Sequence, residues 1–160
     1  MLLAVEDALN NFINMREIEG QKLVQDMGNR IEFVKTKVQE IEGFSKNLVE
    51  EYIIKLENRI NELLKNDVVD KERLAQEIVI FSDKSSIEEE LTRLKSHIIQ
   101  FDNMLKTSSP IGKKFDFLVQ EMNREVNTIG SKANCLEITN RVIELKTEIE
   151  NIREQIQNIE

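Results

Sequence analysis

The residues best suited to chemistry are two glutamates, Glu121 and Glu125, in a stretch whose apolar periodicity predicts a helix. Their four-residue spacing places both carboxylates on one strip, a turn apart, with Glu125 at the border of the apolar face. Carboxylate oxygens hold Mg²⁺ or Mn²⁺, and such a metal can polarise a phosphoryl oxygen and activate water for phosphodiester hydrolysis. Because the chain has 30 acidic residues, the alternative for each carboxylate is an ordinary solvated or salt-bridged side chain.

The single histidine, His97, restricts the other mechanisms. One histidine per chain excludes ribonuclease mechanisms that pair a histidine base with a histidine acid, and zinc sites that need two histidines. Cys135 is also alone, so it forms neither an internal disulfide nor a cysteine-cluster metal site. No phosphate-binding glycine-rich loop is present. Carboxylate chemistry therefore remains, and the alternative for His97 is a helix histidine salt-bridged to a neighbouring acid.

The helix expected over residues 112–132 has one apolar face and two polar strips. The apolar face consists of Phe115, Leu118, Met122, Val126 and Ile129. One polar strip carries Lys114, Glu121, Glu125, Thr128 and Lys132, and the other carries Asp116, Gln120, Asn123, Asn127 and Ser131. Asn and Ser are weak helix formers. The second strip therefore predicts a contact either with a neighbouring helix or with a polar ligand.

Apolar residues at steps of three and four predict helices along the whole chain, and no segment alternates as a strand would. We expect a long helical hairpin over residues 1–66 and a C-terminal helical region over residues 67–160. Gly43 marks a break or phase slip, after which the second helix either folds back or continues with a shifted apolar stripe. Ser86 and Glu89 have the capping-box spacing for the helix that carries His97. A short connection then lets that helix fold against residues 112–132 as an antiparallel pair. The predicted fold class is all-α, with elongated helical hairpins or a bundle.

The last segment has the apolar seam of a coiled coil. Its apolar residues alternate steps of four and three, and they are Ile138, Val142, Leu145, Ile149, Ile152, Ile156 and Ile159. Three heptads of one helix cannot bury such a seam alone, so we expect self-association into a homo-oligomer.

Charge is distributed unevenly along the chain. The net charge of −8 argues against indiscriminate binding of nucleic acid, but Lys106–Lys132 holds five basic residues against three acids. We expect RNA contact to concentrate there, with Lys113 and Lys114 near a helix start suited to a phosphate, and no DNA specificity. No span reaches the ~18 consecutive apolar residues of a membrane helix and no basic leader is seen, so we expect no membrane association and a cytoplasmic location.

Several motifs follow one another in a specific order along the chain. They are Arg16–Gly20, Arg73 with Gln76-Glu77, Glu89-Glu90-Leu91 with Arg93-Leu94 and Ser96-His97, Gly112–Leu118, Gln120-Glu121, Asn123-Arg124-Glu125, Asn127-Thr128, Ser131-Lys132 and Arg153–Glu160. This series resembles the YicC/YloC family of bacterial endoribonucleases over nearly the whole chain. The resemblance covers only the C-terminal half of a typical family member. We therefore expect this sequence to lack the N-terminal half that such a member has. Ser86 stands where the family usually has Asp, and serine is a poor metal ligand.

The resemblance implies an endoribonuclease that uses Mg²⁺ or Mn²⁺ and forms a homo-oligomeric ring, expected to be a hexamer. At the matching positions we assign Glu121 and Glu125 as metal-binding or water-activating carboxylates, Arg124 as stabiliser of the phosphoryl charge and His97 as proton donor. Second-choice metal ligands are Glu77 and Glu90, and RNA-binding candidates are Lys113, Lys114, Asn123, Asn127 and Lys132. The alternative is a non-catalytic helical module for oligomerisation or RNA binding, whose activity needs the missing half or a partner.

Overall fold

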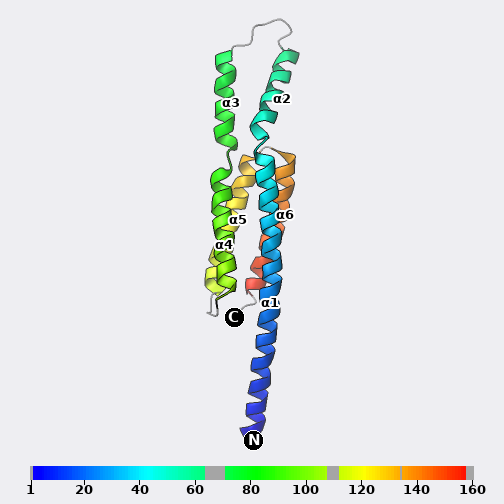
Figure 1. The fold of residues 1–160 in the computed structure, drawn as a ribbon, viewed down its shortest axis with the longest axis vertical. Helices are drawn as coiled ribbons and strands as arrows, with labels where there is room; N and C mark the ends of the chain where they lie inside the picture. Colours follow the sequence, from blue (N-terminus) through cyan, green and yellow to red (C-terminus); the bar gives the residue numbers. More distant parts are fainter. Residues whose placement is uncertain (1, 64–70, 108–111, 134, 158–160) are drawn as a thin grey trace.

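The computed structural model of the chain describes residues 2–63, 71–107, 112–133 and 135–157, and every regular element in these ranges is an α-helix. The elements are α1 (Leu2–Ser45), α2 (Leu48–Leu63), α3 (Lys71–Ser85), α4 (Glu88–Leu105), α5 (Gly112–Lys132) and α6 (Leu136–Gln157). Together they form an elongated molecule with helices running along its long axis (Figure 1). The predicted all-α class is confirmed.

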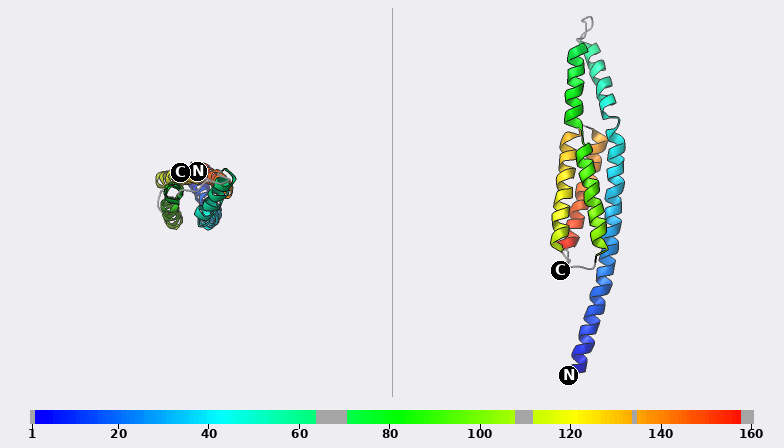
Figure 2. Two further views of the ribbon diagram at one scale, coloured as in Figure 1. Left: turned by 90° about the horizontal axis from the view of Figure 1, so that it is seen from above. Right: turned by 60° about the vertical axis from the view of Figure 1, so that its left-hand side comes forward.

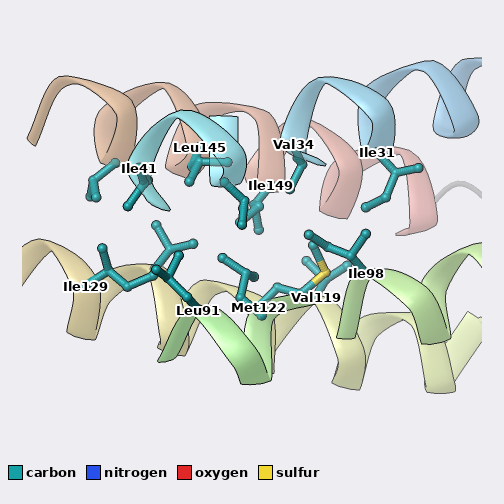
Figure 3. Packing of buried hydrophobic residues seen from close by; sticks show 14 of the residues in the cluster. Ile31, Val34, Ile41, Leu91, Ile98, Val119, Met122, Ile129, Leu145 and Ile149 are labelled. Carbon is teal, nitrogen blue, oxygen red and sulfur yellow. The ribbon is translucent and has the colours of Figure 1, made fainter. Parts of the chain in front are cut away.

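Four of the helices form the bundle that positions the site. Each has two neighbours, in the cyclic order α1, α4, α5, α6, and the apolar stripe of each faces the common axis. Figure 2 shows α4 and α5 side by side along their length. In Figure 3, side chains from α1 and α6 meet those from α4 and α5 across the core, among them Ile31, Val34, Leu145 and Ile149 on one side and Leu91, Ile98, Val119, Met122 and Ile129 on the other.

Ion pairs on the outer edges of this core fix how the helices align. Between α1 and α6, Arg30 and Lys37 contact Glu148 and Glu144 at 2.8 and 2.9 Å. Between α1 and α4, Lys35 contacts Asp102 at 2.5 Å, and Lys95 contacts Glu42 at 2.8 Å. Such partly exposed pairs stabilise a fold by only about 0–1 kcal/mol each. Their main effect is to favour one register between neighbouring helices.

Two segments extend past the bundle at opposite ends (Figure 1). At one end is the N-terminal part of α1, and at the other α2 continues the direction of α1 and pairs with α3. Tyr52 of α2 stacks on Phe81 of α3 with ring centroids 3.6 Å apart. Of the two arrangements expected for the second helix, α2 therefore continues from α1 and does not fold back on it, because α1 uses its apolar stripe against α4 and α6 and α2 pairs with α3. The boundary predicted at 66/67 lies outside the described residues.

Two local predictions about helix ends also need correction. The predicted break at Gly43 falls instead at residues 46–47, and α1 passes through Gly43 as regular helix. Helix α4 begins at Glu88 with Ile87 at the cap position, and no side chain caps it. The capping box predicted for Ser86 and Glu89 is therefore not formed. Ile87 is buried in the core instead, so apolar packing fixes this helix start.

The α6 seam is buried inside the chain's own bundle. Ile138, Val142, Leu145, Ile149, Ile152 and Ile156 are all buried, against a core shared with α1 and α5. The argument that this seam requires a second copy is therefore wrong. Large apolar side chains are exposed instead on the projecting part of α1, at Val5, Leu9, Phe12, Ile13, Met15 and Ile18. Among the described helices, none is long and apolar enough to span a membrane.

Candidate metal centre between helices α4 and α5

A cluster of three potential metal ligands lies where α4 and α5 pack against each other. His97 comes from α4, and Glu121 and Glu125 come from α5. One ligand atom from each side chain can be chosen so that all three lie within 4.8 Å of one another. The antiparallel pairing of the two helices, expected from the short connection between them, thus brings together three of the four residues that the sequence assigned to catalysis.

The two carboxylates of the cluster are poorly neutralised. Glu125 is only 4% exposed, and the nearest cation in the described part of the chain is Arg93, whose Nη1 lies 3.8 Å from Glu125 Oε1. The nearest cation to Glu121 among the described residues is Arg124, whose Nη1 lies 3.9 Å from Glu121 Oε2. Both distances exceed those of a hydrogen bond, whereas ion pairs of the α1 seams lie at 2.5–2.9 Å. Because a buried carboxylate is costly when its cation stays beyond hydrogen-bond distance, this cluster can accept a further positive charge.

The residues present fit a divalent cation. The two carboxylates supply oxygen ligands that suit Mg²⁺ or Mn²⁺, with water completing the shell, and the imidazole nitrogen adds a third ligand that favours Mn²⁺ over Mg²⁺. His97 Nδ1 is buried and has no hydrogen-bond partner among the described residues, so the imidazole has unused bonding capacity. Ligands on opposite sides of one ion lie about 4.2 Å apart, so only small side-chain rotations separate the present arrangement from a metal site.

Two arginines near the cluster differ in position. Arg124, the predicted stabiliser of phosphoryl charge, is 73% exposed at its side chain, and its nearest acid is Glu121 on its own helix. Arg93 projects from α4 toward α5 and contacts both Glu89 and Glu125. The sequence pattern places Arg93 on the side of α4 that faces α5, but Arg93 is not among the residues predicted for catalysis. The available signal was its spacing of four residues before His97, which puts both on one side of the helix.

The second-choice metal ligands do not join the cluster. Glu90 is buried, and its Oε1 accepts a hydrogen bond from Lys132 Nζ at 2.6 Å. It lies one heptad before His97, about 10 Å along the helix. Glu77 lies on α3, outside the bundle, where it is exposed and accepts a hydrogen bond from the Tyr52 hydroxyl at 3.5 Å. Neither second-choice metal ligand therefore belongs to the cluster of His97, Glu121 and Glu125.

The RNA-binding candidates fall into three groups. Lys113 and Lys114 are exposed in the first turn of α5, and Lys114 shares the strip of Glu121 by helical periodicity. The sequence pattern of Ser109 and Pro110 predicts a cap and first turn for this helix, and both residues lie outside the described ranges. Lys132 is engaged by Glu90.

Asn123 and Asn127 lie away from the cluster. Asn127 Nδ2 donates to Asn123 Oδ1 at 3.4 Å within α5. By periodicity their strip is on the opposite side of α5 from Glu121 and Glu125, together with Asp116, which faces Arg153 of α6 at 3.7 Å. Asn123 and Asn127 therefore contact each other on the side of α5 away from His97, and Asn127 is exposed.

Comparison with known proteins gives consistent matches. Residues 41–160 match the family described as "Endoribonuclease YicC-like, C-terminal". The chain is 54% identical over 158 residues to "Probable endoribonuclease YicC" of Clostridioides difficile (strain 630), a match that covers 98% of this chain and 54% of the relative. It is 35% identical over 160 residues to the protein of the same name from Haemophilus influenzae, covering 100% of this chain and 55% of the relative. The chain spans about half the length of these curated relatives.

Proposed function

Because the chain belongs to the YicC-like endoribonuclease family, we propose that it contributes the RNA-cleaving centre of an endoribonuclease and that His97, Glu121 and Glu125 form this centre. The membership agrees with the resemblance in the motifs. The observation that carries the proposal is the convergence of the three side chains from two helices. No cation of the described residues approaches their carboxylates to hydrogen-bond distance. All three lie within the part of the chain that matches the family.

The proposed centre uses a divalent cation, Mg²⁺ or Mn²⁺, held by Glu121, Glu125 and His97. When bound, such an ion polarises a phosphoryl oxygen and lowers the pKa of water at the site. Glu121 is more accessible than Glu125, so it is the carboxylate placed to take a proton from the attacking water. If the two carboxylates alone hold the cation, His97 is instead placed to donate a proton to the leaving oxygen. Lys114, one heptad before Glu121 on the same strip, is placed to bind a flanking phosphate of the RNA.

The test is replacement of both glutamates by glutamine, which keeps shape and removes charge. The purified chain is incubated with a labelled structured RNA in Mn²⁺, in Mg²⁺ or in chelator, and Mn²⁺ binding is titrated separately. The double variant Glu121→Gln, Glu125→Gln should lose metal-dependent cleavage and Mn²⁺ binding while its helical circular dichroism is retained. A matched control is Glu50→Gln with Glu57→Gln, two exposed glutamates of α2 outside the bundle. Cleavage and Mn²⁺ binding at wild-type levels in the double variant would overturn the assignment.

A second candidate function follows from the length of the relatives. Since the chain spans about half of them, it can be a helical module that binds RNA or drives assembly and needs further residues for cleavage. Binding of Mn²⁺ at the cluster without cleavage, next to cleavage by a full-length relative, would favour this module. Cleavage by the chain alone would exclude it.

We also propose that the protein forms a homo-oligomer. The surface that supports oligomerisation is the part of α1 that projects from the bundle and carries the exposed apolar side chains from Val5 to Ile18. A short isolated helix is only marginally stable in water. The asparagines of this projecting part, Asn10, Asn11 and Asn14, are weak helix formers, and its apolar side chains are exposed in the single chain. A second copy that covers these side chains would stabilise the helix.

A further inference from the structure

Arg93 lies beside the cluster of His97, Glu121 and Glu125. A cation bound in the cluster would repel its guanidinium. Its Nη1 lies 3.8 Å from Glu125 Oε1, and its Nη2 contacts Glu89. Among the described residues, no other Lys, Arg or His nitrogen forms an ion pair with Glu125. The arginine therefore neutralises, at long range, the same carboxylate that the proposed metal would bind.

The Arg93 side chain is also accessible. It is 55% exposed, whereas the Glu125 side chain that it faces is 5% exposed. The guanidinium thus lies at the outer rim of the seam with the buried carboxylate beneath it. A guanidinium presents donors in a planar fork, and this fork matches the two non-bridging oxygens of a phosphodiester. Of the two groups, Arg93 is therefore the one that is accessible to a phosphate in solvent.

From this geometry we propose that Arg93 is the residue that binds the scissile phosphate, and that Glu89 and Glu125 hold it in place until Glu125 turns to a divalent cation. The inference rests on the proposed function and adds a residue to it. Arg124 is the less suitable candidate, because it is 73% exposed and faces only Glu121 of its own helix, at 3.9 Å. Arg93, in contrast, comes from the helix of His97 and bridges to the helix of the glutamates.

Loss of the Arg93 charge should have opposite effects on two measured affinities, that for Mn²⁺ and that for RNA. As a cation beside Glu125 it opposes metal binding, so Arg93→Gln should tighten Mn²⁺ binding, by about tenfold for a typical coupling between neighbouring sites. As a phosphate ligand it supports RNA binding, so the same change should weaken RNA binding and reduce the salt dependence by about one charge. Arg93→Lys keeps the charge and loses the fork, so it should leave Mn²⁺ affinity near wild type and still weaken RNA binding. A purely structural arginine would not produce this pattern.

The experiment titrates Mn²⁺ into the whole chain by calorimetry and measures binding of a fluorescent single-stranded RNA in Ca²⁺ at several salt concentrations. Lys95→Gln is the matched control, since Lys95 is on the same helix but pairs with Glu42 of α1, and both measurements should stay at wild type. Unchanged Mn²⁺ affinity, or an unchanged salt slope, in Arg93→Gln overturns the inference. If the wild-type chain itself binds no Mn²⁺, the proposed metal centre fails first, so the two failures are distinguishable. Thermal unfolding of each variant confirms that the compared chains are folded.

Discussion

Gly130 on α5 tests the close packing that holds the site-bearing helix in the bundle. A Cβ atom added at this position would lie 2.9 Å from Cγ1 of Val142 on α6. Carbon atoms in good contact are about 3.5–4.0 Å apart, so an alanine there requires a displacement of more than half an ångström. Val142 cannot easily rotate away, because a β-branched side chain in a helix has one strongly preferred rotamer.

Two opposing effects decide the stability of Gly130→Ala. Alanine in a helix interior is favoured over glycine by about 1 kcal/mol, while overpacking a tight core costs about 1–3 kcal/mol. We expect overpacking to exceed the gain, with a net destabilisation of about 1 kcal/mol. For a chain of this size that lowers the melting temperature by about 2–4 °C. Thermal and urea unfolding followed by circular dichroism measure this change.

Other glycines in the same chain provide the control. Gly28 and Gly43 of α1 are also helical, but an added Cβ would meet nothing within 4 Å. Alanine at either position should therefore raise stability by up to about 1 kcal/mol. A double-mutant cycle of Gly130→Ala with Val142→Ala should show a favourable coupling of at least about 0.5 kcal/mol, because the smaller residue relieves the contact. If Gly130→Ala raised the melting temperature as much as Gly28→Ala, the α5–α6 packing described here would be refuted.

Two other predictions concern acid stability and assembly. Hydrogen bonds from Lys37 and Lys95 lower the pKa of Glu144 and of Glu42 from 4.5, so these pairs stabilise the fold above that pH, and their contribution is lost as pH falls through the lowered values. Thermal unfolding between pH 6 and 3 should show a smaller acid loss in Lys37→Met with Lys95→Met than in wild type, and an identical loss would contradict the assignment. In the projecting part of α1, Leu9→Glu with Phe12→Glu should abolish self-association in sedimentation velocity while the bundle still unfolds cooperatively; oligomers of unchanged size would rule out this surface.

Periodicity predicts which face of each helix is buried, and for α5 it was sufficient. The apolar face from Phe115 to Ile129 is buried as expected, and the strip of Glu121 and Glu125 faces α4, where it meets His97. This succeeded because a helix fixes the direction of each side chain to within a fraction of a turn. Because the connection between α4 and α5 is short, antiparallel pairing of these two helices was the simplest arrangement to predict.

Periodicity does not identify the partner of a buried face. The seam from Ile138 to Ile156 would look the same whether another copy or the same chain covered it, and here α1 and α5 cover it. The same limit applies to Lys132, which shares the strip of Glu125 but is paired with Glu90. Tertiary pairing also decided the start of α4, where burial of Ile87 replaces the capping expected from Ser86.

The charge pattern of the bundle seams explains why chemistry is proposed at only one of them. Where α1 meets α4 and α6, acids and bases face each other at hydrogen-bond distances, so these groups are already satisfied and have little to gain from a ligand. On the α4–α5 seam, Glu90 Oε1 accepts a hydrogen bond from Lys132, although Glu90 Oε2 has no partner among the described residues. One heptad before Lys132, Glu125 is buried with its nearest cation 3.8 Å away. A fold selected for stability alone would pair or remove such a carboxylate, since its desolvation is not repaid. A ligand that supplies positive charge beside His97 and Glu121, as proposed above, would offset that cost.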